Sequence, residues 1–335
     1  MARFRGKSSL ALLKPHSLKK SLTQTAAKVI QGALSPQPNL KADLRASDFA
    51  PKTIAIVYRA GTPAAIEKAR ELATWFLEQK QDYQVCCAPG QKLVAKCKTF
   101  SPKIRDRIDW VIAIGGDGTY LRAVRMLEGR QIPILGINMG NLGFLTETRI
   151  SDMYKAVTST LNHKMEFRPR STLKVEIKRP GQEVATFIAL NDAVLERGSN
   201  THLINIAIFS KKHFVAEIKA DALIVASPTG STAYNLAAGG PILHPEVRAI
   251  VLTPVCPHAL TSRPLIFPDD QHLSLRVLTK DTKAILTVDG INRGAITIDD
   301  EVIVVRNEQD HLVIRKPSAN YFSLLREKLK FGQRN

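Results

Sequence analysis

The sequence contains no apolar run near the ~20 residues that a membrane-spanning helix needs. Its four cysteines are Cys86, Cys87, Cys97 and Cys256, and their spacing matches no zinc motif. Aromatic residues make up only 6% of the chain, and it has no internal repeat or low-complexity tract. We therefore expect neither an integral membrane protein nor a zinc module, and we predict a reduced, intracellular protein with buried thiols.

The remaining composition indicates a folded protein with an excess of positive charge. The chain has 335 residues, enough for two domains, and 44% of them are hydrophobic, which supports a substantial core. The formal net charge is +18, a sign that nucleic acids, membranes and polyphosphate substrates would all favour. A nucleic-acid role would rest on charge alone, because no recognisable module accompanies it. We predict small-molecule partners, with no nucleic acid and no membrane.

The first 50 residues differ from the rest of the chain. They contain nine Lys or Arg residues and two acids, Asp43 and Asp48. Apolar residues recur at helical spacing between residues 18 and 33, and residues 35–38 have the composition of a linker. This extension fits a flexible basic tail, an organellar transit peptide, a docked helix or a start codon assigned too early. We predict a cytoplasmic protein, or an organellar one if residues 1–50 are a transit peptide.

Residues 51–150 alternate between strand and helix patterns. Strands are predicted at residues 53–58, 83–88, 110–114 and 132–138, and helices at residues 63–78 and 120–129. Such alternation is typical of a parallel sheet covered by helices, so we predict an α/β domain with a Rossmann-like parallel sheet. Ligands of such sheets bind at the carboxyl ends of the strands.

Residues 151–316 have a different pattern. Short β-rich runs occur at residues 173–178, 184–190, 204–209, 213–218, 223–226, 273–277, 284–288 and 302–305. A helical pattern is scarce apart from residues 231–238, so we predict a mostly β, sandwich-like second domain. Residues 317–335 alternate apolar and basic residues, which predicts a C-terminal helix that packs back on the body.

A glycine-rich turn, Gly115-Gly116-Asp117-Gly118-Thr119, follows the strand predicted at residues 110–114. A strand, a glycine turn and a helix start form a geometry in which backbone N–H groups bind phosphate. The turn lacks the Walker lysine and does not fit G-x-G-x-x-G, so it is neither a P-loop nor an ordinary dinucleotide-binding turn.

The carboxylate inside this turn has two interpretations. In a kinase, Asp117 can accept a hydroxyl proton or help to hold a cation. Alternatively, it is the N-cap of the following helix. Arg122, one turn into that helix, faces either the same phosphate or solvent. The turn at residues 138–143 is expected at the same edge of the sheet as Asp117, which supports a functional reading of both.

Two later stretches have the composition of ligand-binding segments. Asn191-Asp192 follows a strand-like run and suits hydrogen bonds to ribose hydroxyls or to an amide, although both residues are common in turns. Small, hydroxyl and glycine residues dominate residues 227–241. They either cap a helix or let a flat ring approach closely, with Tyr234 as a stacking face. His202 and Asp289 are lone polar residues, and neither alone indicates a site.

Taken together, these stretches resemble the NAD kinase family. The GGDGT turn alone is shared with diacylglycerol and sphingosine kinases and with phosphofructokinases. The more specific signal is an ordered set: GINMGNLGFLTE (136–147), LNDAVLERG (190–198), KADALIVASPTGSTAYNLAAGGPILHP (219–245), TPVCPHALTSRPL (253–265) and VDG (288–290). The resemblance implies transfer of the terminal phosphate of ATP, or of polyphosphate in some members, to the 2′-hydroxyl of the adenosine ribose of NAD, giving NADP.

The resemblance also implies a role for each matched position. Asp117 matches the proton acceptor, with Gly118 beside it at the dinucleotide, and Arg122 matches a ligand-contacting position. Asn191 and Asp192 match the pair that holds the ribose and nicotinamide portions. Further implied ligand contacts are His202, Lys219, Asp221, Thr232, Ala233, Tyr234, Asn235, Leu236 and Ala237. The family binds a divalent cation, usually magnesium, through the nucleotide phosphates, and it forms homodimers or homotetramers.

Three positions depart from the family pattern. Ala222 stands where a glycine is usual, and Ser227 replaces a common threonine. Ile291 follows Asp289-Gly290 where many members have glutamine, which weakens the case for a contact from that side. Two other functions stay open at this point: a lipid kinase that shares the glycine turn, and a catalytically silent NAD(P)-binding sensor.

Overall fold

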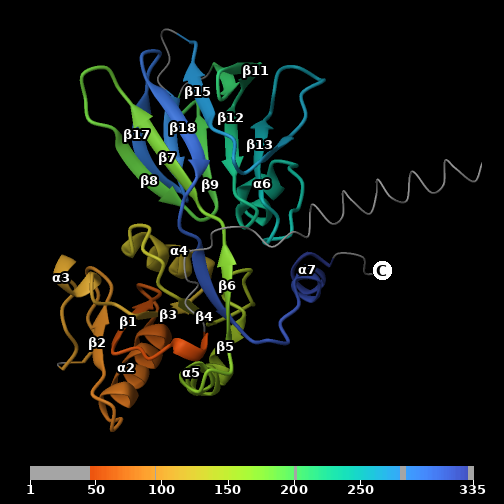
Figure 1. Ribbon diagram of the computed structural model, residues 1–335. Coiled ribbons are helices and arrows are strands. Elements are labelled where there is room, and N and C mark those ends of the chain that lie inside the picture. Colours follow the sequence, from red (N-terminus) through yellow and green to blue (C-terminus); the bar gives the residue numbers. More distant parts are fainter. Residues whose placement is uncertain (1–45, 95, 200–201, 280–283, 331–335) are drawn as a thin grey trace, which may run out of the picture. The chain divides into compact units, whose positions relative to one another are not determined.

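The computed structural model describes residues 46–94, 96–199, 202–279 and 284–330, whose strands form three sheets (Figure 1). The predictions made for residues 1–45 lie outside this described part. Within it, no helix has both the length and the apolar character that crossing a membrane requires.

The first sheet contains the glycine turn. Its strands are β1 (Thr53–Tyr58), β2 (Gln84–Cys87), β3 (Trp110–Gly115), β4 (Ile134–Asn138), β5 (Thr148–Arg149), β6 (Glu166–Arg170) and β19 (His311–Arg315). The order is β2-β1-β3-β4-β19-β6, with β5 also paired to β4. All pairs are parallel except that of β6 with β19, which confirms the predicted parallel sheet. Two strands from residues 151–316 complete it, and the domain boundary at residue 150 stays a prediction.

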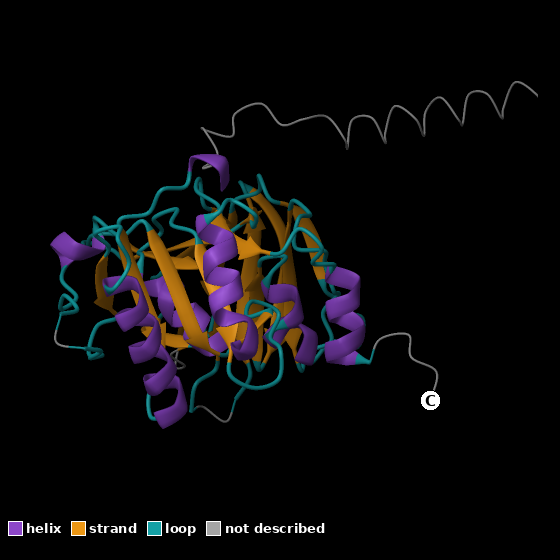
Figure 2. Cartoon of the chain, turned by 90° about the horizontal axis from the view of Figure 1, so that it is seen from below, coloured by secondary structure: helices purple, strands orange, loops and turns teal. Residues whose placement is uncertain are grey.

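Helices cover both faces of this sheet (Figure 2). They are α2 (Pro63–Leu77), α3 (Pro102–Arg105), α4 (Asp117–Met126) and α5 (Met153–Leu161), with 3-10 turns η1 (Ala46–Asp48) and η2 (Ile150–Asp152). α2 and α5 pack on the face that contains Ile112, and α4 packs on the face that contains Val111. Because successive side chains point to opposite faces, a strand covered on both sides is apolar throughout, as β3 is. α5 is not among the predicted elements.

The other two sheets are antiparallel. One contains β7 (Leu173–Lys178), β8 (Ala185–Ala189), β10 (Ile204–Ser210), β11 (His213–Ala220), β15 (Leu273–Val277) and β18 (Glu301–Arg306). The other contains β9 (Asp192–Glu196), β12 (Ala222–Ala226), β13 (Ala249–Val255), β14 (Leu265–Pro268), β16 (Ala284–Val288) and β17 (Ile291–Ile296). Their inner faces share one core, in which Val175 and Val225 come from opposite sheets, so the predicted sandwich is confirmed.

Two short segments differ in length from their predictions. Residues 231–238 form a 3-10 turn, η3 (Gly230–Thr232), and a single helical turn, α6 (Tyr234–Ala237). The C-terminal helix, α7 (Tyr321–Leu329), begins after Asn320, whose side chain accepts hydrogen bonds from the first N–H groups of the helix. The Tyr321 hydroxyl donates to the carbonyl oxygen of Leu243 at 3.1 Å, which ties α7 to the body.

The thiols only partly match the prediction that they are buried. Cys86 and Cys87 are buried in β2, and burial raises the pKa of the Cys86 thiol to about 12, so it stays protonated. Cys97 is half-buried, and Cys256 is exposed, so the prediction is wrong for Cys256.

Candidate active site

Asp117 lies at the carboxyl end of β3, where it begins α4. The N-cap of that helix is Gly116, so the interpretation of Asp117 as the N-cap is wrong. The Asp117 carboxylate instead accepts four hydrogen bonds from a neighbouring turn. The Phe144 N–H donates to Oδ2 at 2.9 Å. The Leu145 and Thr146 N–H groups donate to Oδ1 at 3.1 Å each, and the Thr146 hydroxyl donates to Oδ1 at 2.9 Å.

This arrangement leaves one side of the carboxylate available. A carboxylate has about four acceptor positions, two on each oxygen. Oδ1 of Asp117 accepts three hydrogen bonds, whereas Oδ2 accepts one. Asp117 is only half-buried, so Oδ2 can accept a further hydrogen bond from a ligand.

The turn that holds Asp117 depends on two further residues. Asn138, which ends β4 and pairs in register with Gly115, donates from Nδ2 to the Thr146 hydroxyl oxygen at 2.8 Å. A Cβ atom added at Gly143 would overlap the Asp117 carboxylate, so this position requires glycine. The sequence placed residues 138–143 near Asp117, but it gave no signal that residues 144–146 bind the carboxylate.

A pocket of about 440 Å³ lies beside the glycine turn, bordered by Gly116, Gly118 and three arginines. Arg59 is exposed, and Arg122 donates from Nη2 to the carbonyl oxygen of Pro89 at 2.7 Å. Arg125 donates from Nη1 to the carbonyl oxygen of Asp289 at 3.4 Å, and burial lowers its pKa. Guanidinium groups next to a helix N-terminus suit the negative charge of phosphate groups. The structure therefore brings Gly118 and Arg122 together at one pocket, and Asp117 lies in the chain between Gly116 and Gly118, which both line that pocket.

Asn191 and Asp192 follow β8, as predicted, and Asp192 also begins β9. The N–H groups of Leu190, Asn191 and Asp192 donate to the Asp289 carboxylate at 2.9, 2.8 and 3.2 Å. Asp289 occupies the turn between β16 and β17, with a φ of 46°. Burial, reinforced by the charge of Asp289, raises the pKa of Asp192 to about 7.

Asp289 was not predicted to be a site residue, because nothing in the sequence links it to residue 191. Its Asp-Gly pair signals only a tight turn between strands. The structure makes it the residue that fixes the backbone of the Asn191-Asp192 pair.

The small-residue segment packs directly on this pair. The Ser227 N–H donates to the carbonyl oxygen of Asn191 at 2.8 Å, and the Ser227 hydroxyl donates to that of Leu190 at 2.5 Å. A Cβ atom at Gly230 would overlap the Asn191 backbone. Leu190, which precedes the pair, belongs to the same core cluster as Tyr120 of α4, the helix that begins with Asp117.

Within the predicted adenosine segment, the side chains divide into two kinds. Tyr234 is 44% exposed, and its ring is accessible for stacking. Asn235 is buried, and its amide bonds to Ser231, Pro241 and Thr253, so it holds the loop together. The other side chains of the segment, those of Thr232, Ala233, Leu236 and Ala237, are half-buried or exposed.

The last three predicted residues are Asp221, His202 and Lys219. Burial raises the pKa of Tyr234, and the nearby charge of Asp221 adds to this shift, so Asp221 adjoins the predicted adenosine segment. Asp221 forms an ion pair with Arg197, with Oδ1 and Nε 2.7 Å apart. His202 and Lys219 are exposed, and within the described ranges no hydrogen bond or ion pair connects either side chain to Asp117 or Asn191. Across those same ranges, no group of three or more His, Cys, Asp or Glu side chains is arranged to hold a metal ion.

Sequence comparison identifies the chain's relatives. The ATP-NAD kinase N-terminal domain family matches residues 54–165, and the ATP-NAD kinase C-terminal domain family matches residues 190–316. An NAD kinase from Bdellovibrio bacteriovorus is 53% identical over 284 residues, which cover 84% of this chain and 93% of that protein. An NAD kinase from Heliobacterium modesticaldum is 36% identical over 284 residues, covering 84% and 99%.

Two solved structures have a similar fold. Yeast NADH kinase complexed with NADH aligns with a TM-score of 0.78 and 29% identity, over 85% of this chain and 90% of that one. An NAD kinase from Archaeoglobus fulgidus in complex with ATP aligns with a TM-score of 0.62 and 23% identity, over 82% and 99%. The second likeness concerns the fold alone.

Proposed function

The chain belongs to the NAD kinase family, and we propose that it transfers the terminal phosphoryl group of ATP, or of polyphosphate, to the 2′-hydroxyl of the adenosine ribose of NAD, giving NADP. The observation that carries this proposal is the half-open carboxylate of Asp117, which lies between Gly116 and Gly118 of an arginine-lined pocket. A single oriented acid beside a phosphate-binding turn suits phosphoryl transfer to an alcohol.

Asp117 acts as the proton acceptor in this proposal. A ribose hydroxyl is a poor nucleophile at neutral pH, and a positioned carboxylate contributes roughly 10²–10⁴-fold to such a step. Oδ2 accepts the 2′-hydroxyl proton while the ribose oxygen forms a bond to the terminal phosphorus. The bond from that phosphorus to the leaving phosphate oxygen breaks, and ADP departs. The hydrogen bonds to Oδ1 hold the carboxylate in one orientation during this exchange.

The remaining residues align and neutralise the two ligands. Arg59, Arg122 and Arg125 border the pocket for the donor phosphates and offset their charge. Asn191 and Asp192 hold the ribose and nicotinamide portions of NAD, and the residues that surround its adenosine are Thr232, Ala233, Tyr234, Asn235, Leu236 and Ala237. His202, Lys219 and Asp221 are assigned outer contacts. Much of the rate gain comes from holding both substrates in line.

A magnesium ion would reach this site with the donor. Mg²⁺ is commonly held by substrate phosphates, one or two carboxylates and water, so the lack of a described protein cluster for a metal suits it. It supplies charge neutralisation on the phosphates. We also propose a homodimer or homotetramer, in the cytoplasm unless residues 1–50 direct the chain to an organelle.

The test is a panel of donors and acceptors with purified full-length protein and magnesium. NADP should form from NAD with ATP or polyphosphate. NADH and diacylglycerol serve as alternative acceptors, and binding of NAD without turnover would indicate a silent sensor instead. Absence of NADP with both donors would refute the proposed function.

A further inference from the structure

Strand β19 is the last strand of the chain, yet it lies inside the first sheet, next to β4. Val313 packs in the same core cluster as Tyr120 of α4 and Leu145 of the turn that binds Asp117. Because residues two apart on a strand share a face, His311 and Arg315 point to this same side of the sheet. The strand therefore presents two polar side chains to the elements around Asp117.

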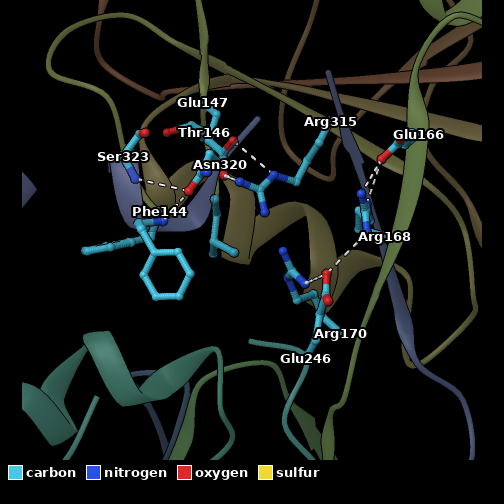
Figure 3. Close-up of polar contacts among 12 residues, drawn as sticks. Phe144, Thr146, Glu147, Glu166, Arg168, Arg170, Glu246, Arg315, Asn320 and Ser323 are labelled. Atoms are coloured by element: carbon cyan, nitrogen blue, oxygen red, sulfur yellow. Dashed lines mark hydrogen bonds and ion pairs between the residues drawn. The ribbon is translucent and has the colours of Figure 1, made fainter. Parts of the chain in front are cut away.

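Arg315 reaches the turn that holds Asp117 (Figure 3). Its Nε donates to Oε2 of Glu147 at 3.0 Å, and its Nη2 lies 2.7 Å from Oε1 of the same residue. The side chains of Arg315 and Glu147 are only 8% and 20% exposed. The Nε–Oε2 contact is a hydrogen bond that fixes direction, whereas Nη2 approaches Oε1 as an ion pair without a hydrogen bond of its own, and little solvent screens the two charges here.

Glu147 directly follows Thr146 in the chain. Thr146 donates both its N–H and its hydroxyl to Oδ1 of Asp117, and its carbonyl oxygen accepts the N–H of Gly143. A shift of Glu147 therefore moves the donors that orient the carboxylate. The Arg315–Glu147 pair therefore acts on Asp117 through Thr146. Among the described hydrogen bonds and ion pairs, Arg315 makes no contact with Asp117 itself.

His311 connects the same strand to the helix that carries Asp117. Its Nε2 lies 2.7 Å from the hydroxyl oxygen of Tyr120, three residues after Asp117. Burial raises the pKa of Tyr120 well above its usual value and lowers the pKa of His311 to about 3. Both groups are therefore neutral at pH 7 and share a hydrogen bond that does not change with pH near neutrality.

We propose that Arg315 is a positioning residue for phosphoryl transfer: through Glu147 it fixes the turn that orients Asp117, while His311 fixes α4 from the same strand. This inference rests on the proposed function. In this proposal β19, which is far from the glycine turn in the sequence, controls the geometry of the proton acceptor. Such control affects turnover more than substrate binding, because Arg315 borders neither the arginine-lined pocket nor the Asn191-Asp192 pair.

The test compares Arg315→Met and Arg315→Lys with Arg168→Met in the full-length protein. Arg168 lies on the adjacent strand β6 and pairs with Glu166, with Nη2 and Oε2 2.6 Å apart, so it is a matched but half-exposed control. A displacement of about 1 Å costs roughly 10²-fold in rate. We expect Arg315→Met to lower kcat by about that factor, with the KM for NAD and for ATP changed less than about threefold. Arg315→Lys keeps the positive charge but loses the planar guanidinium, so its kcat should lie between those of the wild type and Arg315→Met.

A second readout does not depend on activity. Hydrogen exchange of the Phe144, Leu145 and Thr146 amides reports the bonds to Asp117 in the protein without substrates. We expect their protection to fall about tenfold in Arg315→Lys and Arg315→Met, and to stay unchanged in Arg168→Met. The amides of β1 serve as an internal reference for global unfolding.

The outcomes separate this inference from the function on which it rests. Suppose that the wild-type protein forms NADP, and that both Arg315 variants keep its kcat and its amide protection. That result leaves the proposed function intact and overturns the positioning proposal. Loss of protection throughout the sheet, with kcat falling only as far as the folded fraction, also overturns it, because Arg315 would then act on stability. If the wild-type protein forms no NADP, the proposed function fails, and the exchange data still decide whether Arg315 holds the turn.

Discussion

Two carboxylates hold backbone segments in similar ways, one in each half of the molecule. Asp117 accepts three N–H groups and a hydroxyl from residues 144–146. Asp289 accepts three N–H groups from residues 190–192. Asp117 is half-buried between two glycines that border a pocket, whereas Asp289 is only 6% exposed. The same arrangement of donors therefore leaves one carboxylate accessible and encloses the other.

The difference lies in access rather than in the number of hydrogen bonds. Each carboxylate is oriented by backbone donors that cannot rotate away. Asp117 is only half-buried, so a ligand can approach its Oδ2, whereas the carboxylate of Asp289 is buried. We expect substitution of Asp117 to affect turnover, and substitution of Asp289 to affect stability and binding of NAD.

The largest expected effect is that of Asp117→Asn. The variant keeps an oxygen for the three donors at Oδ1 and loses only the acceptor of the Phe144 N–H, at a half-exposed position, so we expect it to fold, but its amide cannot accept the hydroxyl proton. We expect kcat to fall by roughly 10²–10⁴-fold. Steady-state kinetics and circular dichroism measure the two parts of this prediction.

Asp109→Asn is the matched control for that variant. Asp109 accepts the N–H groups of Lys52 and Thr53 at the start of β1, the end of the parallel sheet away from the glycine turn, so it lies outside the site. Its kcat should stay close to that of the wild type. Near wild-type turnover in Asp117→Asn would show that Asp117 is not the proton acceptor.

Asp289→Asn should have the next largest effect. An amide nitrogen in place of one oxygen would face the N–H groups of residues 190–192 and leave at least one buried donor unpaired. We expect the free energy of unfolding to fall by about 3 kcal/mol, with a higher KM for NAD and a smaller change in kcat. Urea unfolding and NAD titration check this. An unchanged KM for NAD would show that Asp289 does not position Asn191 for NAD binding.

The smallest effect concerns the pH dependence of stability. The folded pKa of Asp192 is about 7, above the ordinary 3.8, because burial and then Asp289 disfavour its charged form. The folded protein therefore holds a proton that the unfolded chain has released, so this contribution is fully present below pH 3.8 and is lost as pH rises through 7. Acidification from pH 7 to 5.5 should add about 2 kcal/mol relative to Asp192→Asn. Denaturant titrations at several pH values measure it, and parallel curves would contradict it.

The sequence predicted the fold class because the two halves have different periodicities. Continuous apolar runs such as residues 110–114 indicate strands buried on both faces, and alternating runs such as residues 173–178 indicate a sandwich. It missed α5, which is only nine residues long and buries just four of them, so its helical periodicity is weak. It also missed β19, since nothing local in residues 311–315 indicates that they pair with β4 rather than with the sandwich.

The candidate site was predictable in part for a related reason. Glycines and a lone acid at a strand end are a local signal, so Asp117 and its turn were recognisable. Asp289 and Arg315 act through partners about a hundred or more residues away, and such pairings depend on the tertiary fold. Single-sequence patterns therefore identify the candidate acid more readily than the residues that hold it in place.

The position of β19 has a consequence for biosynthesis. A chain emerging from the ribosome exposes β1 to β5 early, but β19, which pairs with β4 at Ile134, is among the last segments to be made. Until then, β5 pairs only with the end of β4 at Ile137 and Asn138, and the start of β4 carries an open edge of the kind that promotes pairing between chains. The nascent protein must keep that edge unpaired while the whole sandwich is synthesised, so premature termination before residue 311 removes the strand that would cover it.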